Sequence, residues 1–258
     1  MDLDIKGLRV LVTAGASGIG LAIAQAFVRE GAHVVICDVD EAALAARAAS
    51  DPALPRFTCD VANRASVAEL FKNVTATLGG LDVLVNNAGI AGPTARVEEM
   101  HPEDWDRCLE VCLTGQFNCA RLAVPLLRQS RNASIINLSS AAGRLGFALR
   151  SPYAAAKWGV IGFTKSLSIE LGPDNIRVNA ILPGLVAGDR QRRVLEAKAQ
   201  QRGVSFKEME DIAFSFTSIK EYVTPEQLAD QIVFMCSPRG RTISGQAISI
   251  CGDTRMLG

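Results

Sequence analysis

Short runs of apolar, often β-branched residues recur along the chain, separated by longer segments with the apolar spacing of amphipathic helices. Most of these runs are apolar nearly throughout, which is typical of parallel strands that are buried on both faces. The regular alternation of strands and helices predicts a parallel sheet with right-handed crossovers. The predicted strands cover residues 8–14, 32–38, 56–60, 81–87, 134–140, 176–182 and 246–251.

The predicted fold class is therefore α/β, a Rossmann-type doubly wound sheet of about seven strands with helices on both faces. Gly31 and the pair Gly79 and Gly80 follow helical patterns and are expected to end helices. Because no repeat, low-complexity linker or break in composition divides the sequence, residues 1–258 are expected to form a single domain.

The stretch 188–224 is the exception, because it is charged, helical in pattern and inserted after the sixth predicted strand. In sheets of this kind, ligands bind beyond the carboxyl ends of the strands. We therefore expect this stretch to cover the ligand as a substrate lid. A solvated pair of surface helices is the alternative.

Charge and composition exclude several classes of partner. The 27 basic and 27 acidic residues balance, so no global field attracts nucleic acid or an anionic membrane. No apolar run is long enough to span a bilayer, and the N-terminal stretch lacks the features of a signal peptide, so a cytoplasmic protein is expected. The seven cysteines are scattered and are expected to be reduced and mostly buried. With only two histidines, a metal site is not expected.

A glycine-rich turn lies between the first predicted strand and the helix that follows it. Gly15, Gly18 and Gly20 allow the backbone to approach a pyrophosphate closely at the helix N-terminus. Asp38 ends the second predicted strand, where its carboxylate can bind an adenosine ribose diol and would repel a 2′-phosphate. The pattern therefore favours NAD over NADP. A plain strand–turn–helix with Ser17 as the helix N-cap is the alternative.

Tyr153 and Lys157 are separated by three alanines in a predicted helix. Residues four apart share one helix face, so both side chains can enter one crevice. A nearby ammonium favours the phenolate, and a phenol in that setting can exchange a proton with an alcohol at neutral pH. The alternative is an exposed helix on which the two residues are incidental.

Four sequence elements in order and register carry a family resemblance that covers nearly the whole chain. The stretches TAGASGIG (13–20), NNAG (86–89), SS followed by YAAAK (139–157) and NAILPG (179–184) resemble those of the short-chain dehydrogenases/reductases. The resemblance implies Ser140, Tyr153 and Lys157 as catalytic residues, with Ser139 as the alternative serine. It also implies that Lys157 binds the nicotinamide ribose and that the protein is a homotetramer.

The resemblance further implies a set of cofactor contacts. Asn87, Ala88 and Gly89 would run beside the adenosine ribose, and Asp60 and Val61 would flank the adenine. Pro183 and Gly184 would adjoin the nicotinamide, and the backbone N–H of Val186 would bind its carboxamide. The cofactor-binding residues expected from the sequence are Gly15, Ser17, Gly18, Ile19, Gly20, Asp38, Asp60, Val61, Asn87, Ala88, Gly89, Tyr153, Lys157, Pro183, Gly184 and Val186.

The sequence also departs from the family pattern. Ala14 replaces the first glycine of the turn, which is tolerable if its φ stays negative. Cys112 replaces an asparagine, so side-chain amide bonds are lost and a slower or differently routed proton relay is expected. Gly188 stands where many relatives have threonine, and residues 251–253 read Cys-Gly-Asp in place of Asp-Gly-Gly.

Arginines near the expected substrate site suggest what the substrate is. Arg144 and Arg150 lie between Ser140 and Tyr153, and Arg190, Arg192 and Arg193 open the expected lid. Because arginine pairs bidentately with carboxylate, sulfonate or phosphate, a small anionic or polyhydroxylated alcohol is one expectation. The alternative is that these arginines are solvated or pair with acids of the lid such as Glu208 and Asp211.

The function expected from the sequence is hydride transfer between a nicotinamide cofactor, with NAD favoured, and a secondary alcohol or ketone. Two alternatives remain open: an NAD-binding sensor or partner subunit with weak catalysis, and an epimerase or dehydratase on the same fold.

Overall fold

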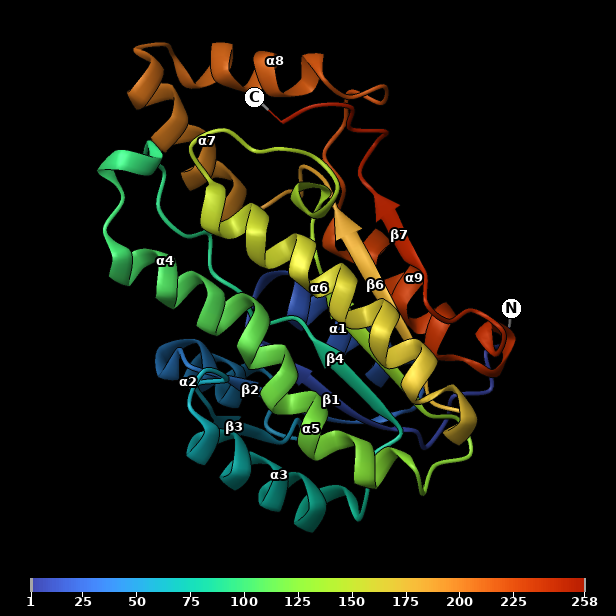
Figure 1. Cartoon of the computed structure of the whole chain (residues 1–258). Coiled ribbons are helices and arrows are strands. Elements are labelled where there is room, and N and C mark those ends of the chain that lie inside the picture. The colour runs from blue at the N-terminus through green and yellow to red at the C-terminus, as the bar shows by residue number, and fades with distance from the viewer. Residues whose placement is uncertain (1, 258) are drawn as a thin grey trace.

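The computed structural model describes residues 2–257, in which all of the predicted strands form one parallel sheet. The strands lie in the order β3-β2-β1-β4-β5-β6-β7. The first three strands are added toward one edge of the sheet and the last four toward the other, so the strand order reverses between β1 and β4. This arrangement confirms the doubly wound fold (Figure 1). The strands are β1 (Arg9–Thr13), β2 (His33–Asp38), β3 (Arg56–Thr58), β4 (Val83–Asn86), β5 (Ser134–Leu138), β6 (Arg177–Pro183) and β7 (Ala247–Ile250).

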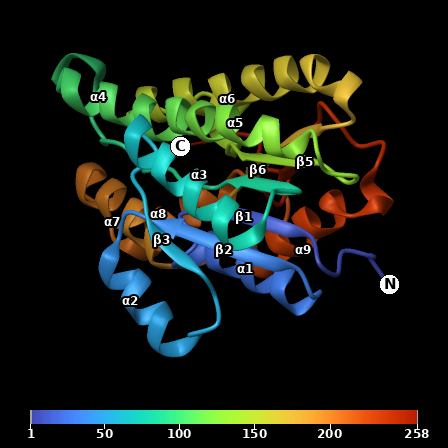
Figure 2. The same ribbon diagram turned by 90° about the horizontal axis from the view of Figure 1, so that it is seen from below.

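Helices cover both faces of the sheet, as the view from below shows (Figure 2). One face carries α1 (Gly18–Arg29), α2 (Glu41–Ser50) and α9 (Pro225–Cys236). The other face carries α3 (Arg64–Leu78), α5 (Gly115–Leu127) and α6 (Ser151–Glu170), with α4 (Pro102–Leu109) leading into α5. Gly79 ends α3 at a φ of 69°, as its place in the sequence predicts.

Two apolar layers, one on each face of the sheet, explain why the strands are apolar nearly throughout. Val10 and Val12 pack with Phe27 of α1 on one face, whereas Leu11 between them packs with Phe71 of α3 on the other. Successive side chains of a strand point to opposite faces, so both sets of positions must be apolar.

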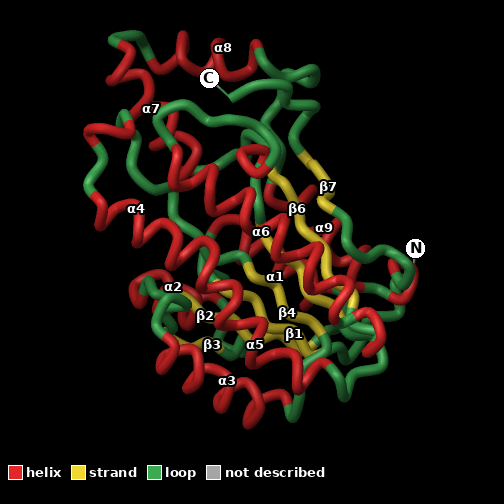
Figure 3. The backbone as a smooth tube through the Cα atoms, viewed as in Figure 1, coloured by secondary structure: helices red, strands yellow, loops and turns green. Residues whose placement is uncertain are grey.

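The stretch 188–224 forms two helices, α7 (Asp189–Arg202) and α8 (Phe206–Ser215), as its pattern predicts. Both helices lie beyond the carboxyl ends of β6 and β7 (Figure 3). The chain returns through a parallel bridge between Val186 and Val223 and then begins α9 with a capping box at Thr224. The excursion is therefore anchored at both ends at the edge that binds ligands in such sheets.

No helix among residues 2–257 has the length and apolar character needed to cross a bilayer.

At the opposite, amino-terminal edge of the sheet, Arg9 and Asp82 tie β1 to the start of β4. The guanidinium of Arg9 donates two hydrogen bonds to the Asp82 carboxylate, at 2.9 and 2.8 Å, and the Arg9 backbone N–H adds a third at 2.9 Å. Although burial acts to raise the pKa of Asp82, the bonds from Arg9 and Ser130 outweigh it and lower that pKa below its ordinary value.

We expect Asp82→Asn to lower the free energy of unfolding at pH 7 by about 1–3 kcal/mol, because charge-assisted hydrogen bonds are lost. A carboxyl group with a lowered pKa stabilises the fold above its ordinary value of about 4, and that stabilisation disappears as the pH falls through the folded-state pKa. The difference from the wild type, measured by urea unfolding, should therefore narrow below about pH 4.

Glu69→Gln is the matched control, because Glu69 pairs with Lys72 on an exposed helix surface and should contribute at most about 1 kcal/mol. An Asp82→Asn deficit that stays the same from pH 7 to pH 3 would contradict the electrostatic explanation.

Candidate active site

A cavity of about 390 Å³ opens at the carboxyl edge of the sheet, between the strand ends and α7. It gathers residues that are far apart in the sequence: the turn before α1, the ends of four strands and the first turns of α6. Twelve of the residues predicted for catalysis or cofactor binding line this cavity: Ser17, Gly18, Ile19, Asp38, Asn87, Gly89, Ser140, Tyr153, Lys157, Pro183, Gly184 and Val186.

Gly15 and Gly20 lie behind the cavity wall and are required by packing. A Cβ on Gly15 would stand 2.7 Å from the Cβ of Ile36, and one on Gly20 would stand 2.6 Å from Nδ2 of Asn87. Only glycine allows these backbone segments to approach so closely. The two residues shape the turn from behind and are not part of the cavity lining.

Asp60, Val61 and Ala88 also lie outside the cavity lining and are held by other parts of the chain. The Asp60 carboxylate accepts a bond from Arg107 at 3.0 Å, and the Val61 carbonyl accepts one from Asn118 at 2.9 Å. The backbone N–H of Ala88 donates to the Thr13 hydroxyl at 3.0 Å. A role for these residues beside an adenosine remains a prediction.

Ala14 adopts a left-handed conformation with φ of 49°, so the condition under which its methyl group is tolerable, a negative φ, is not met. Its carbonyl accepts a bond from Nδ2 of Asn87 at 3.0 Å, and the neighbouring Thr13 carbonyl accepts a second bond of the same length. These bonds hold the turn in a shape that a residue with a Cβ adopts only at an energetic cost.

The Asp38 carboxylate is fixed at the rim of the glycine turn. One oxygen accepts the backbone N–H of Ala16 at 3.2 Å, and the other accepts the N–H of Asp40 at 3.1 Å. Asp38 is 9% exposed, and Asp38 and Asp40 are both among the residues that line the cavity, so this part of the lining is acidic.

Tyr153 and Lys157 both enter the cavity from α6. The Lys157 ammonium lies 5.7 Å from the centre of the Tyr153 ring and donates a 2.7 Å hydrogen bond to the carbonyl of Leu138, the last residue of β5. Lys157 is only 3% exposed. The pair predicted from the sequence is therefore brought together at the strand ends.

The two candidate serines take different roles. Ser139 is buried, and its hydroxyl donates to the backbone carbonyl of Lys157 at 2.7 Å. Ser140 is partly exposed in the cavity, and its Oγ accepts the N–H of Ala142 at 3.2 Å. With an acceptor position filled by that N–H, the Ser140 hydroxyl hydrogen remains available to a ligand. The geometry favours Ser140 over Ser139.

Cys112 lies in a five-residue π-helical turn, Glu110–Thr114, between α4 and α5. Its Sγ accepts the N–H of Ile90 at 3.3 Å and donates to the Ile90 carbonyl at 3.4 Å. A hydrogen bond from Cys108 lowers the pKa of Cys112 against the effect of burial, and the Lys157 ammonium acts in the same direction. The thiol thus keeps weak side-chain bonds to this loop. Its effect on a proton relay remains a prediction.

All seven cysteines are free, and only Cys251 is not fully buried.

The arginines predicted near the substrate separate into two groups. Arg150, Arg190 and Arg193 line the cavity, whereas Arg144 bonds to the Ala247 carbonyl and Arg192 pairs with Glu196 at 2.9 Å. Arg192 is thus exposed and paired with an acid of the lid, as the alternative expects, although that acid is Glu196 and not Glu208 or Asp211. Glu208 instead caps α8 through Ser205, and Asp211 pairs with Lys207.

Sequence reasoning missed Lys198, which reaches the cavity from α7 and is 5% exposed. It also missed Phe147, whose ring both Arg150 and Lys198 approach. No sequence pattern points to either residue, because their proximity arises from the way that α7 packs over the cavity.

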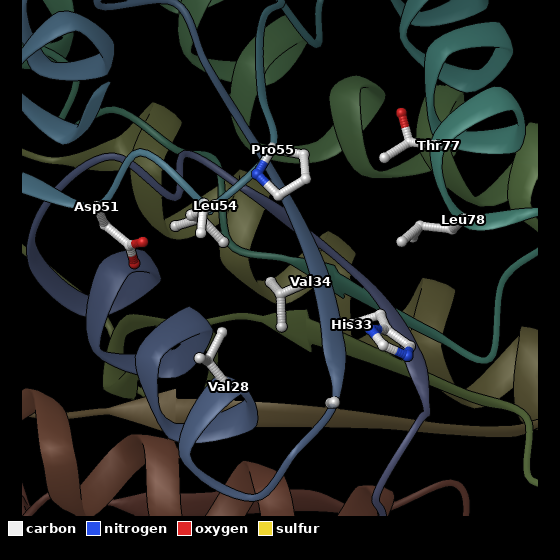
Figure 4. Close-up of a pocket in the computed structure, with 10 residues that line it drawn as sticks. Val28, His33, Val34, Asp51, Leu54, Pro55, Thr77 and Leu78 are labelled. Carbon is white, nitrogen blue, oxygen red and sulfur yellow. The ribbon is translucent and has the colours of Figure 1, made fainter. Parts of the chain in front are cut away.

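A second cavity, of about 490 Å³, lies at the other edge of the sheet (Figure 4). It is lined largely by apolar and backbone surface around Val34, Leu54 and Leu78, with His33 and Asp51 at its rim. Because it adjoins the amino end of β2, it is far from the strand ends that carry Asp38 and Ser140. It contains none of the predicted site residues.

Comparison with known proteins agrees with this geometry. Residues 13–252 match the family model described as Enoyl-(Acyl carrier protein) reductase. D-beta-hydroxybutyrate dehydrogenase of Cupriavidus necator is 33% identical over 246 residues, which cover 93% of this chain and 95% of that protein.

Among solved structures, a variant of actinorhodin polyketide ketoreductase with NADPH has a TM-score of 0.91 and 32% identity, covering 95% of this chain and 96% of its own. NAD+-bound xylitol dehydrogenase has a TM-score of 0.90 and 26% identity, covering 96% of this chain and 99% of its own.

We expect Ala14→Gly to raise the free energy of unfolding by about 1 kcal/mol, because glycine adopts a positive φ without the steric cost that alanine pays. For a protein of this size, that corresponds to an increase in Tm of about 2–4 °C. Thermal unfolding followed by circular dichroism measures it. Ala16→Gly is the control: Ala16 is buried and is not among the positive-φ residues of 2–257, so glycine there should lower the Tm. Equal shifts at both positions would exclude backbone strain at Ala14.

Proposed function

Because the chain belongs to the short-chain dehydrogenase/reductase family, we propose that it is an NAD-dependent oxidoreductase acting on a secondary alcohol or ketone. The observation that carries this proposal is the meeting of Tyr153, Lys157 and Ser140 in one cavity at the carboxyl edge of the sheet. The relatives support the general reaction, since their names include a hydroxy-acid dehydrogenase, a xylitol dehydrogenase and a ketoreductase.

The residues around the cavity fit a dinucleotide. The N-terminus of α1 begins at Gly18, whose backbone is open to the cavity, so its N–H groups can bind a pyrophosphate. Asp38 stands where a ribose diol would donate to it. A bound nicotinamide would supply the hydride acceptor or donor, and Pro183, Gly184 and Val186 would hold it.

In the direction of alcohol oxidation, Tyr153 would take the proton of the substrate hydroxyl. The C–H bond of the same substrate carbon breaks, and its hydrogen leaves with both electrons as the hydride. Lys157 would hold the nicotinamide ribose, as the family resemblance implies, and its ammonium lies beside Tyr153, 5.7 Å from the centre of the ring. Ser140 donates a hydrogen bond to the substrate oxygen and so orients it and stabilises the charge that develops there. In the reverse direction, Tyr153 returns the proton to that oxygen.

The preference for NAD rests on Asp38 and Asp40. A 2′-phosphate placed at the diol position would be repelled by the Asp38 carboxylate, and Asp40 adds a second negative charge nearby. The glycine turn contributes no lysine or arginine to the cavity lining among residues 2–257. Since the similar solved structures include one with NADPH and one with NAD+, these two acids of this chain, and not the relatives, are the basis of the proposal.

We propose, in addition, that α7 and α8 act as a lid over the bound substrate. One side of α7 lines the cavity, and Phe216 after α8 lines it as well. The α7 residues in the lining are Asp189, Arg190, Gln191, Arg193, Val194, Leu195 and Lys198. Ordered closure of such an element would exclude water from the reacting atoms.

Tyr153→Phe should lower turnover of ketones by about 10²–10⁴-fold, because the group that donates the proton to the substrate oxygen is lost, while NADH affinity stays within about threefold. Turnover is followed at 340 nm with a panel of ketones, and NADH binding by fluorescence titration. The chain offers a matched control in Tyr222→Phe, which removes the hydroxyl of the other tyrosine, bonded to Glu210 at 2.6 Å. That variant should keep its turnover within about threefold.

Two results would contradict the proposed reaction. NADH binding by the wild type without turnover of any ketone or alcohol would indicate a cofactor-binding sensor or subunit. Consumption of substrate without net change in NADH would indicate an epimerase or dehydratase.

The ratio of kcat/KM for NAD+ to that for NADP+ should exceed about 10, since electrostatic repulsion of about 1.4 kcal/mol already gives that factor. Asp38→Ser should reduce the ratio by about tenfold or more, chiefly by improving the use of NADP+. Glu41→Gln is the control: it removes the same charge from exposed α2, outside the cavity lining. A wild type that prefers NADP+ would overturn the assignment of NAD.

A further inference from the structure

We propose that the substrate carries an anionic group, a carboxylate, sulfonate or phosphate, and that Arg150 and Lys198 hold it beside Tyr153. This inference rests on the proposed function, because it names the kind of substrate that the same cavity accepts. It concerns the part of the cavity lined by α7 and Arg150, whereas Asp38 and Asp40 line the same cavity from the end of β2 and the start of α2.

Arg150 is an unusual cation, since it lines the cavity although it is only 2% exposed. Its Nη2 donates to the carbonyl of Ala91, but its buried Nε has no hydrogen-bond partner. No ion pair among residues 2–257 includes Arg150. A buried charge without an opposite charge is costly, so the side chain is best explained by an anion that arrives with a ligand.

The position of Arg150 places such an anion next to the reacting atoms. Arg150 directly precedes α6, and its Cζ lies 5.4 Å from the centre of the Tyr153 ring. An anion bound by the guanidinium would therefore be separated from the carbon that faces Tyr153 by only a few bonds. A small oxo acid or hydroxy acid meets that requirement.

Lys198 brings a second cation from α7 to the same place. Its Nζ lies 4.0 Å from the centre of the Phe147 ring, and the Cζ of Arg150 lies 5.3 Å from that same centre. Burial, together with repulsion by Arg150 and Arg202, lowers the pKa of Lys198 to about 8. A bound anion would relieve this repulsion, so closing α7 over the cavity is favoured when the ligand is negative.

The acids of the helical excursion are mostly engaged elsewhere. Glu196 pairs with Arg192, Glu208 caps α8, Glu210 accepts from Tyr222 and Asp211 pairs with Lys207. Asp189 is the one acid of α7 in the cavity lining, where Arg190, Arg193, Arg150 and Lys198 outnumber it. The lining beneath α7 therefore contains more basic than acidic side chains.

Binding is tested by calorimetry with matched ketones and NAD+, a combination in which no reaction occurs. The probes are acetoacetate, 4-oxopentanoate and 2-oxopropanesulfonate, each compared with its neutral methyl ester or, for the sulfonate, the methyl sulfone. At least one anion should bind about 10-fold or more tightly than its neutral partner, as expected for charge-assisted bonds. Turnover of all the probes with NADH is measured in parallel.

Arg150→Met should reduce the preference for the anion over its neutral partner by about 10–100-fold, and Lys198→Met should reduce it in the same direction. Arg150→Lys should restore part of the preference, since it retains the charge without the guanidinium geometry. Arg192→Met is the control, because Arg192 is an exposed arginine of α7 outside the cavity lining and should leave the preference unchanged. NADH titration of each variant verifies that it has folded.

The outcomes separate this inference from the proposed function. If neutral ketones bind and turn over as well as every anionic partner, the inference is wrong and the oxidoreductase assignment stands. If an anion binds preferentially through Arg150 but no probe or alcohol is turned over, the anion site stands and the assignment fails. An undiminished preference for the anion in both Arg150→Met and Lys198→Met would also overturn the inference.

Discussion

The hydrogen bond from the buried Lys157 ammonium to the carbonyl of Leu138 is the contact on which the candidate site depends. It fixes a positive charge at the carboxyl end of β5, where it can act on Tyr153 one helical turn earlier. Gln116 donates to the same carbonyl at 3.1 Å, and Ser139 donates to the backbone of Lys157. Two bonds therefore join the end of β5 and the residue after it to Lys157 of α6, and a third joins the same strand end to α5, so the tyrosine is placed by the sheet and not by a flexible loop.

The parallel sheet makes this convergence possible. All of its strands end at one edge, so residues separated by more than a hundred positions meet there without long connections. A buried polar chain supports the arrangement from within: Asn86 donates to Asn137 at 2.9 Å, and Asn137 donates to Thr164 at 3.0 Å. These bonds join β4, β5 and α6, and their buried groups are satisfied by one another, which favours a single relative position of the three elements.

Much of this arrangement could be predicted because local rules determine it. Strands buried on both faces must be apolar throughout, and Gly15 and Gly20 are required where backbone segments touch. Tyr153 and Lys157 are related by helix geometry alone. The other features depend on tertiary contacts that produce no periodicity or motif in the sequence. The positive φ of Ala14 is stabilised by bonds from Asn87, and Cys112 meets Ile90 across a loop.

The last described residues of the chain form part of the cavity wall. Leu257 forms a parallel bridge with Phe147, and Thr254 and Met256 also line the cavity. The loop between Ser140 and Tyr153 is thus braced by a segment that lies more than a hundred residues away in the sequence. Proteolytic trimming, or an affinity tag joined directly after this segment, would alter the binding pocket itself, whereas Leu3 and its neighbours pack against the helix layer of α1 and α9.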